Sequence, residues 1–78
     1  MVEIRYFSIL REKLGKEKEE FEFEGTVSEL RKLLLSKYPE IENILNSVKF
    51  AVNEEYVDED YKISDGDRVA LIPPVSGG

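Results

Sequence analysis

The sequence predicts an α+β domain in which a mixed sheet of four to five strands packs on one main helix. Three observations predict it: apolar residues alternate near both ends of the chain, a helix start signal and a helical period lie between them, and 78 residues allow one domain. One amphipathic helix can cover one face of such a sheet. We expect the domain to span residues 1–74 and to be followed by a flexible tail, residues 75–78.

The first predicted strand covers residues 2–10, where apolar and charged side chains alternate. A half-buried strand has this period because successive side chains point to opposite faces of the sheet. Phe7 is the exception, since it falls on the face that Glu3 and Arg5 mark as polar. The opposite face is expected to be buried, and its residues are Val2, Ile4 and Tyr6.

A charged stretch over residues 11–18 follows and contains Gly15, which predicts a hairpin loop. The chain then alternates again over residues 20–24, with Phe21 and Phe23 on the inner face and glutamates on the outer one. The two strands and their loop predict a hairpin at the start of the domain.

A helix signal comes next. Thr26 and Glu29 have the spacing of a capping box, in which the hydroxyl and the carboxylate each bind a free amide of the first turn. Apolar residues then recur near the 3.6-residue period until Pro39, which ends the helix. The expected apolar face consists of Val27, Leu30, Leu33, Leu34 and Tyr38. A further short helical turn is expected at Ile41, Ile44 and Leu45.

The remaining segments are short strands and turns. Residues 48–52 alternate, residues 53–55 are typical of a turn, and a short strand over residues 56–57 follows. Residues 64–67 form a turn cluster before a last strand over residues 68–72. The first and last strands can pair in the middle of the sheet, because in both of them the residues that face inward are apolar. This order matches the β-grasp, or ubiquitin-like, fold, which assigns no function by itself.

Composition excludes most kinds of catalytic site. The chain has a net charge of −6, no Cys and no His, so it lacks disulfides, a thiol nucleophile, a cysteine zinc site and the commonest general base. Its acidic balance argues against nucleic acid, whose phosphates favour clustered Lys and Arg. No apolar run approaches the roughly 20 residues of a membrane span, and the first residues do not resemble a signal peptide. We expect a cytoplasmic protein that binds neither nucleic acid nor membrane.

The acidic residues that begin at Asp58 do not have the spacing of a calcium loop. An EF-hand needs ligands at alternate positions and then a glycine, but Lys62 and Ile63 occupy a ligand place and the glycine place. Residues 65–67 are instead typical of a turn. No metal site is predicted.

The carboxyl end is the most informative stretch for function. Pro73 and Pro74 donate no backbone hydrogen bond, so the strand must stop pairing there and the chain should leave the sheet as an extended arm. Gly77 and Gly78 have no side chains, so the arm could enter a channel too narrow for other residues. We expect a functional tail rather than a frayed terminus.

Motifs of a known family occur along the whole chain. They are Tyr6-Phe-Ser-Ile-Leu-Arg-Glu12, Gly25-Thr26-Val27 with Leu30, Val52-Asn53, Asp65-Gly66-Asp67-Arg68-Val69-Ala70, and the ending Ile72-Pro-Pro-Val-Ser-Gly-Gly78. In this order they resemble the MoaD family, the sulfur-carrier small subunits of molybdopterin synthase. The ending is the most specific part of the resemblance, and Ser8 stands where the family usually has Ala.

The resemblance implies that the terminal carboxylate of Gly78, next to Gly77, carries the chemistry. In this family an adenylating enzyme (MoeB-like) uses ATP to make an acyl-adenylate, and a sulfur donor replaces AMP to leave a thiocarboxylate. The sulfur then passes, in the large synthase subunit (MoaE-like), to cyclic pyranopterin monophosphate and builds the dithiolene of molybdopterin. The chain would not be an enzyme on its own and would hold no permanent cofactor.

A contact patch for these partners is expected on the outer face of the sheet. Parity and turn position place the apolar side chains of Phe7, Tyr56 and Ile72 there, and the family's partner-binding patch uses apolar residues at the matching positions. Arg11 also matches a family position and is assigned to the contact. The arm would add partner contacts through Pro73, Pro74, Val75 and Ser76.

Three other functions remain open. A ThiS-like sulfur carrier for thiamin thiazole also ends in Gly-Gly, but it usually lacks the Pro-Pro-Val-Ser lead-in. A ubiquitin-like modifier would join Gly78 to target lysines through isopeptide bonds. A passive binding module of this fold would not use its terminus.

Overall fold

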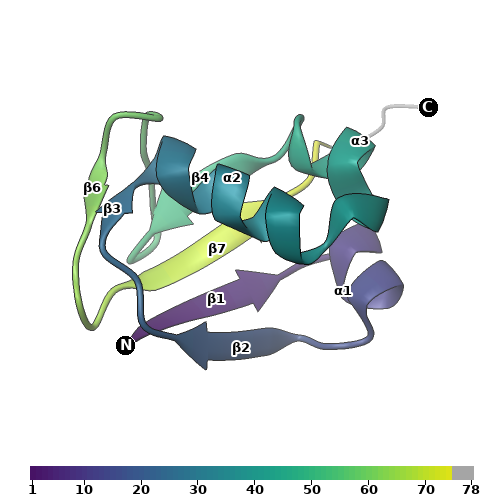
Figure 1. Ribbon diagram of the computed structural model, residues 1–78, viewed down its shortest axis with the longest axis horizontal. Coiled ribbons are helices and arrows are strands. Elements are labelled where there is room, and N and C mark those ends of the chain that lie inside the picture. Colours follow the sequence, from purple (N-terminus) through teal and green to yellow (C-terminus); the bar gives the residue numbers. More distant parts are fainter. Residues whose placement is uncertain (75–78) are drawn as a thin grey trace.

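Residues 1–74 are described in the computed structural model, and five of their strands form one sheet with helices against one face (Figure 1). The strands are β1 Val2–Tyr6, β2 Lys18–Phe21, β4 Lys49–Val52, β5 Glu55–Tyr56 and β7 Arg68–Ile72. Their order is β2-β1-β7-β4-β5, in which β1 and β7 are parallel and the other neighbours are antiparallel. The predicted mixed sheet of the β-grasp fold is confirmed.

The pairing of β1 with β7 explains why the first and last strands share one apolar parity. Ile4 lies opposite Val69, and Tyr6 lies opposite Leu71. These four side chains are at most 2% exposed and point toward the helices. Because the side-chain period of a strand is two, the alternate residues form the opposite side of the sheet, which we call the outer face.

Helix α2, Val27–Lys37, lies across the inner face of the sheet (Figure 1). The N–H of Glu29 donates to Thr26 Oγ1 at 3.2 Å, and the N–H of Thr26 donates to Glu29 Oε1 at 2.8 Å. The predicted capping box is therefore confirmed. The chain continues through a 3₁₀ turn and the short helix α3, Glu42–Leu45. The buried side chains of this layer are Val27, Leu30, Leu34, Ile41 and Leu45.

The charged stretch predicted as a hairpin loop begins instead with a helix. Strand β1 is shorter than predicted, and α1 covers Ile9–Leu14. Leu10 is buried and Leu14 is half-buried, so this i,i+4 pair packs on the core. Gly15 ends the helix at φ 71°, a left-handed conformation that glycine adopts readily. The glycine that indicated a loop is thus a helix C-cap.

The strand predicted over residues 20–24 is also wrong in its bounds. The observed strand covers residues 18–21, and Phe21 and Phe23 are half-buried against the core. The chain then enters β3, Gly25–Thr26, which pairs with β6, Lys62–Ile63, in a small second sheet. Strands of two residues have too little periodicity to be visible in a sequence.

Leu33 was expected in the core, and this expectation is wrong. Each helical residue turns by about 100°, so Leu30 and Leu34 share the face that meets the sheet. Leu33 lies at the side of that face and is 36% exposed. The apolar face of α2 is therefore narrower than its leucine content indicates.

Strand β7 ends at Ile72, directly before Pro73, which confirms the predicted stop. Pro73 is buried and Pro74 is exposed. The predicted flexible tail, residues 75–78, lies outside the described residues. Over residues 1–74, none of the helices is both long and apolar enough to span a bilayer.

Candidate functional site on the outer face of the sheet

Three apolar side chains selected from the sequence surround one hollow of about 310 Å³ on the outer face. Phe7 directly follows β1, Ile72 ends β7, and Tyr56 belongs to the edge strand β5. Tyr56 is 70% exposed and Phe7 is 40% exposed, so much of this apolar surface is open to solvent. The hollow is also lined by Arg5, Ala51, Glu54, Arg68 and Ala70.

Two alanines, whose side chains are small, leave a depression at the centre of the outer face. Ala51 lies opposite both Ala70 and Tyr56, and Arg5 lies opposite Ala70. Larger side chains at the two alanines would fill the space between the surrounding residues. Neither alanine was among the predicted site residues, although strand parity already placed Ala70 on the same face as Ile72.

The backbone at Ser8 determines where Phe7 lies. Ser8 has φ 54° and ψ −127°, and its side chain makes no capping hydrogen bond. The N–H of Leu10 donates to the Phe7 carbonyl at 3.1 Å, and the N–H of Glu12 donates to the Ser8 carbonyl at 3.2 Å. This sharp turn joins β1 to α1 and leaves Phe7 at the rim of the hollow.

Tyr56 is positioned by a two-residue hairpin. Asn53 has φ 51° and Glu54 has φ 73°, the left-handed pair of a type I′ turn. The amide of Asn53 donates to Asp67 Oδ1 at 3.1 Å, and its side-chain oxygen accepts from the N–H of Arg68 at 3.0 Å. These bonds tie the hairpin to β7 and hold β5 at the edge of the sheet.

One carboxylate gathers three cations beside the hollow. The Glu3 carboxylate lies 3.2 Å from Arg5 Nε, 3.5 Å from Lys18 Nζ and 3.4 Å from Arg68 Nε. The hydrogen bond from Arg5, with the charges of Arg5 and Lys18, lowers the pKa of Glu3 below its ordinary value of 4.5. Glu3 is therefore ionised at neutral pH and orients the surrounding cations.

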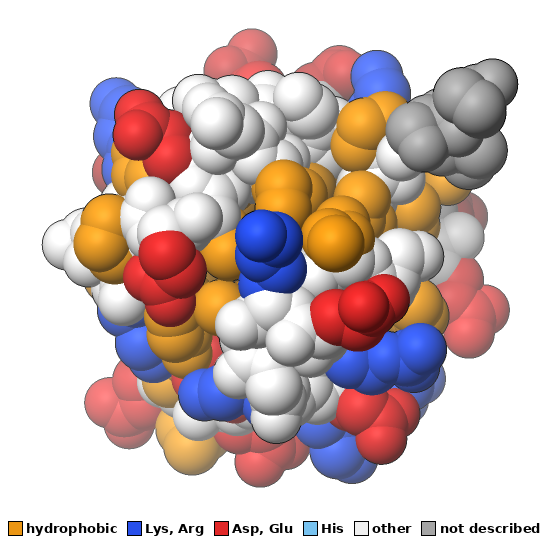
Figure 2. Space-filling view, turned by 90° about the vertical axis from the view of Figure 1, so that its right-hand side faces the viewer, with side chains coloured by type: hydrophobic (Ala, Val, Ile, Leu, Met, Phe, Trp, Pro, Cys, Tyr) orange, Lys and Arg blue, Asp and Glu red, His pale blue; other side chains and the backbone are white. Residues whose placement is uncertain are grey.

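Arg11 is exposed on α1 and lines a second hollow, of about 360 Å³, next to the first. Phe7 and Arg5 line both hollows, whereas Tyr56 and Ile72 line only the first. Figure 2 shows the end of the molecule at which β1 and β7 finish. Hydrophobic side chains lie near the middle of this view around one basic side chain, and further basic and acidic side chains lie toward its margins.

Of the predicted arm, only the two prolines belong to the described residues. Pro74 is exposed directly after Pro73. Four predicted site residues lie outside the described residues: Val75, Ser76, Gly77 and Gly78.

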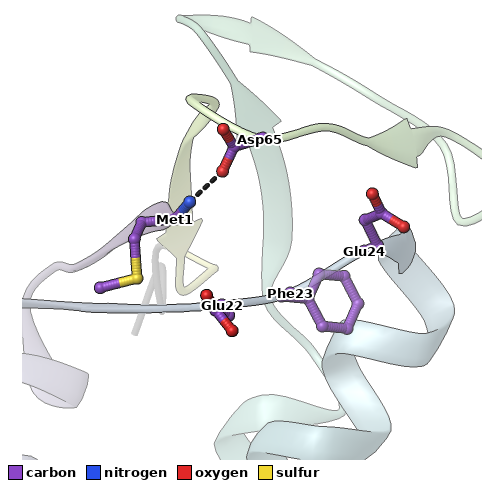
Figure 3. Close-up of a pocket in the computed structure, with 5 residues that line it drawn as sticks. All are labelled: Met1, Glu22, Phe23, Glu24 and Asp65. Carbon is purple, nitrogen blue, oxygen red and sulfur yellow. Dashed lines mark hydrogen bonds and ion pairs between the residues drawn. The ribbon is translucent and has the colours of Figure 1, made fainter.

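A larger hollow, of about 550 Å³, lies at the other end of β1 (Figure 3). The Met1 ammonium forms an ion pair with Asp65 there, and Glu22, Phe23 and Glu24 complete the lining. None of the predicted site residues within residues 1–74 borders this hollow. Within residues 1–74, no three His, Cys, Asp or Glu side chains are grouped to hold a metal ion.

The ThiS family matches residues 4–78 of the chain. The chain belongs to the ThiS family. Among relatives of this ThiS-family chain, the molybdopterin synthase sulfur carrier subunit of Chlamydomonas reinhardtii is 36% identical over 99% of this chain and 98% of that protein. The protein of the same name from Dictyostelium discoideum is 39% identical over 96% of this chain and 93% of that protein. These similarities confirm the resemblance to the MoaD family.

Solved structures show the same fold. A protein described as a molybdopterin converting factor subunit 1 from Pyrococcus furiosus has a TM-score of 0.83 at 28% identity, covering 95% of this chain and 97% of that one. A chain of the complex of subunits 1 and 2 of the molybdopterin-converting factor from Helicobacter pylori has a TM-score of 0.73 at 28% identity, covering 99% and 97%. SAMP1 from Haloferax volcanii has a TM-score of 0.78 at 25% identity, covering 99% and 98%.

Proposed function

We propose that this chain is the sulfur-carrier small subunit of a molybdopterin synthase. The observation that carries the proposal is the similarity to named sulfur carrier subunits over nearly the whole length of both chains. The likeness to a chain from a complex of two molybdopterin-converting factor subunits supports it. The carrier acts in the cytoplasm as a subunit, and the catalytic residues belong to its partners.

In the proposed reaction the Gly78 carboxylate is first activated, because an anionic carboxylate is a poor acyl donor. In an adenylating partner, a carboxylate oxygen attacks the α-phosphorus of ATP and pyrophosphate leaves. Hydrosulfide released by a sulfur donor then attacks the acyl carbon, AMP leaves with its bonding electron pair, and loss of the sulfur-bound proton leaves a thiocarboxylate on Gly78. ATP is thus used by the partner, and the carrier needs no cofactor of its own.

In the large synthase subunit, the thiocarboxylate sulfur passes to cyclic pyranopterin monophosphate. A dithiolene contains two sulfur atoms, so two loaded carriers must react in turn. Gly77 and Gly78 have no side chains, so we propose that they pass through a channel that would exclude larger residues.

The outer face is the proposed docking surface for both partners. Phe7, Tyr56 and Ile72 surround an open hollow next to the strand end from which the chain continues to Gly78. Arg11 and the segment from Pro73 to Ser76 are proposed as additional contacts. Because both partners would cover the same hollow, the carrier must leave the activating enzyme before it binds the large subunit.

An intact-mass experiment tests the carrier function. The chain is incubated with the adenylating enzyme, ATP and a sulfur donor, and we expect the mass change of replacing one oxygen by sulfur. Deletion of Gly78 should abolish the change. An unchanged mass with an enzyme that activates another carrier would refute the proposal. Adding the large subunit and the pterin precursor should then yield molybdopterin.

The docking role is tested by Phe7→Ala. We expect the affinity for each partner to fall about tenfold or more, because large apolar side chains in the centre of an interface dominate its binding energy. Leu33→Ala is the matched control, since Leu33 is similarly exposed (36% against 40%) but lies on the helical side. A folded Phe7→Ala variant that binds both partners as tightly as the Leu33→Ala variant would contradict the assignment.

A second candidate function is protein modification. The likeness to SAMP1, the small archaeal modifier protein 1 of Haloferax volcanii, favours it. That protein shares the fold and 25% of the aligned residues. In this case Gly78 would form isopeptide bonds to lysines of other proteins. Covalent adducts that require Gly78 and the activating enzyme would demonstrate it. The thiazole carrier remains a further alternative within the ThiS family, and production of thiazole instead of molybdopterin would identify it.

A further inference from the structure

The charges of this acidic chain are unevenly distributed. It has 11 Lys and Arg residues against 17 Asp and Glu residues. Strand pairing and the lining of the hollow between Phe7, Tyr56 and Ile72 place four of these cations and three of these carboxylates on the outer face. Seven cations and fourteen carboxylates lie elsewhere. The outer-face residues are Arg5, Lys18, Lys49 and Arg68 with Glu3, Glu20 and Glu54. The outer face therefore has a formal charge of +1, and the other side chains together have −7.

The positive charge is concentrated next to Phe7. Arg5, Arg11 and Lys18 line the hollow of about 360 Å³, which we call the cationic hollow. Among residues 1–74, Glu17 supplies the only carboxylate of its lining. Within residues 1–74, Arg11 has no ion pair or side-chain hydrogen bond, and Lys18 has one contact, to Glu3 at 3.5 Å. Arg5 also contacts Glu3, which does not line this hollow. With both Glu17 and Glu3 counted, the three cations still outnumber the carboxylates around the hollow.

The cationic hollow adjoins the apolar hollow, so one partner surface can cover both. Phe7 and Arg5 belong to the linings of both. An arginine guanidinium binds a carboxylate through two parallel hydrogen bonds. Two arginines and a lysine around one hollow therefore suit a carboxylate side chain of a protein bound over Phe7.

We propose that the partner docked on the outer face places an Asp or Glu side chain in the cationic hollow between Arg5, Arg11 and Lys18. This inference rests on the proposed function and adds the chemistry of the partner's contact surface. The side chains outside the outer face total −7, a sum in which Arg11 and Glu17 of the cationic hollow cancel. This negative charge repels an acidic partner patch, whereas the outer face attracts it. The charge distribution therefore orients the carrier during encounter.

Charge reversal with a matched control tests the proposal. The double variant Arg11→Glu/Lys18→Glu is compared with Lys32→Glu/Lys62→Glu, which changes the net charge equally at exposed positions outside both hollows. Association and dissociation rates with the large synthase subunit are measured at low and high salt. If Arg11→Glu/Lys18→Glu does not fold, the charge-neutralising double variant Arg11→Gln/Lys18→Gln takes its place.

We expect the first variant to associate about tenfold more slowly at low salt, since charge complementarity acts mainly on the association rate. The control should change less than about threefold, and the difference should shrink at high salt because salt screens exposed charges. Equal effects of the two variants, or faster association of the first one, would overturn the inference. A different result would refute the proposed function itself: a wild-type chain that neither gains sulfur nor binds the large subunit.

Discussion

Three residues other than glycine have left-handed backbone angles within residues 1–74, and all three adjoin the outer face. Ser8 directs Phe7, while Asn53 and Glu54 form the hairpin before Tyr56. A residue with a Cβ atom loses roughly 1–2 kcal/mol in this conformation. Such strain is commonly found at functional sites, where surrounding contacts impose it. Its location here agrees with a docking role of the outer face.

Ser8→Gly should therefore raise the free energy of unfolding by about 0.5 kcal/mol. The relief of strain exceeds the added backbone entropy of glycine in the unfolded chain only by a small amount. Ser8→Ala retains the strain and removes a hydroxyl that makes no capping bond, so it should not stabilise the protein. Urea unfolding of the two variants distinguishes them, and a less stable Ser8→Gly variant would contradict the explanation.

Glu19 is a junction between β2, β1 and the end of α2. Its Oε2 atom accepts hydrogen bonds from Tyr6 Oη at 2.5 Å and Tyr38 Oη at 2.7 Å, and Lys37 Nζ lies 3.3 Å from Oε1. Burial and the bond to Glu19 raise the pKa of Tyr6 well above 10. Partial burial alone would raise the pKa of Glu19, but the bonds from Tyr38, Tyr6 and Lys37 outweigh it and lower that pKa.

The lowered pKa of Glu19 predicts a dependence of stability on pH. A carboxyl whose pKa is lower in the folded state stabilises the fold above its ordinary value of 4.5, and this stabilisation is lost as pH falls through the folded pKa. Glu19→Gln should reduce the free energy of unfolding at pH 7 by about 1 kcal/mol and flatten its decline below about pH 5. Glu20→Gln, at the exposed neighbour, is the control. An unchanged pH profile in Glu19→Gln would contradict this role.

At the scale of elements, helix α2 depends on a local signal that the sequence contains in full. Thr26→Ala removes the hydroxyl that accepts from the N–H of Glu29, and we expect it to reduce the free energy of unfolding by about 1 kcal/mol. Thr26→Ser retains an acceptor and should lose much less. Thermal or urea unfolding provides the measurement. Equal stabilities of Thr26→Ala and Thr26→Ser would show that the capping box does not stabilise the helix.

The other elements show why local signals are not always sufficient. Helix α1 has one turn of apolar spacing within a charged stretch, and its C-cap, Gly15, is also a common loop residue. Its helical conformation depends on Leu10, which is fully buried in the core. Strands β3 and β6 form only because two segments far apart in the sequence meet.

At the scale of the whole molecule, Arg31 connects several layers. Its guanidinium donates to the carbonyls of Leu45 and Val48 and to Glu59, and it lies 4.8 Å from the centre of the Phe50 ring. The bond from Arg31 lowers the pKa of Glu59. One side chain on α2 thus holds the end of α3, the start of β4 and the segment before β6.

Arg31→Leu should reduce the free energy of unfolding by about 2 kcal/mol, because it leaves two carbonyls and a carboxylate without their donor. Lys32→Leu, at the adjacent exposed position, should change it by no more than about 0.5 kcal/mol. Denaturant unfolding followed by circular dichroism measures both. Similar losses in the two variants would contradict the role given to Arg31.

The parities of the main strands, the capping box, the order of the main strands and helix α2, and the family could all be predicted from the sequence, because they depend on spacing within one segment or on residue identity. Helix α1 and strands β3 and β6 could not. Parity also predicted Phe7 and Ile72 on the outer face. Tertiary packing, in contrast, places Phe7, Tyr56 and Ile72 around one hollow and brings cations from three strands to Glu3. These features arise between residues distant in the chain, whose approach depends on register and packing rather than on local pattern.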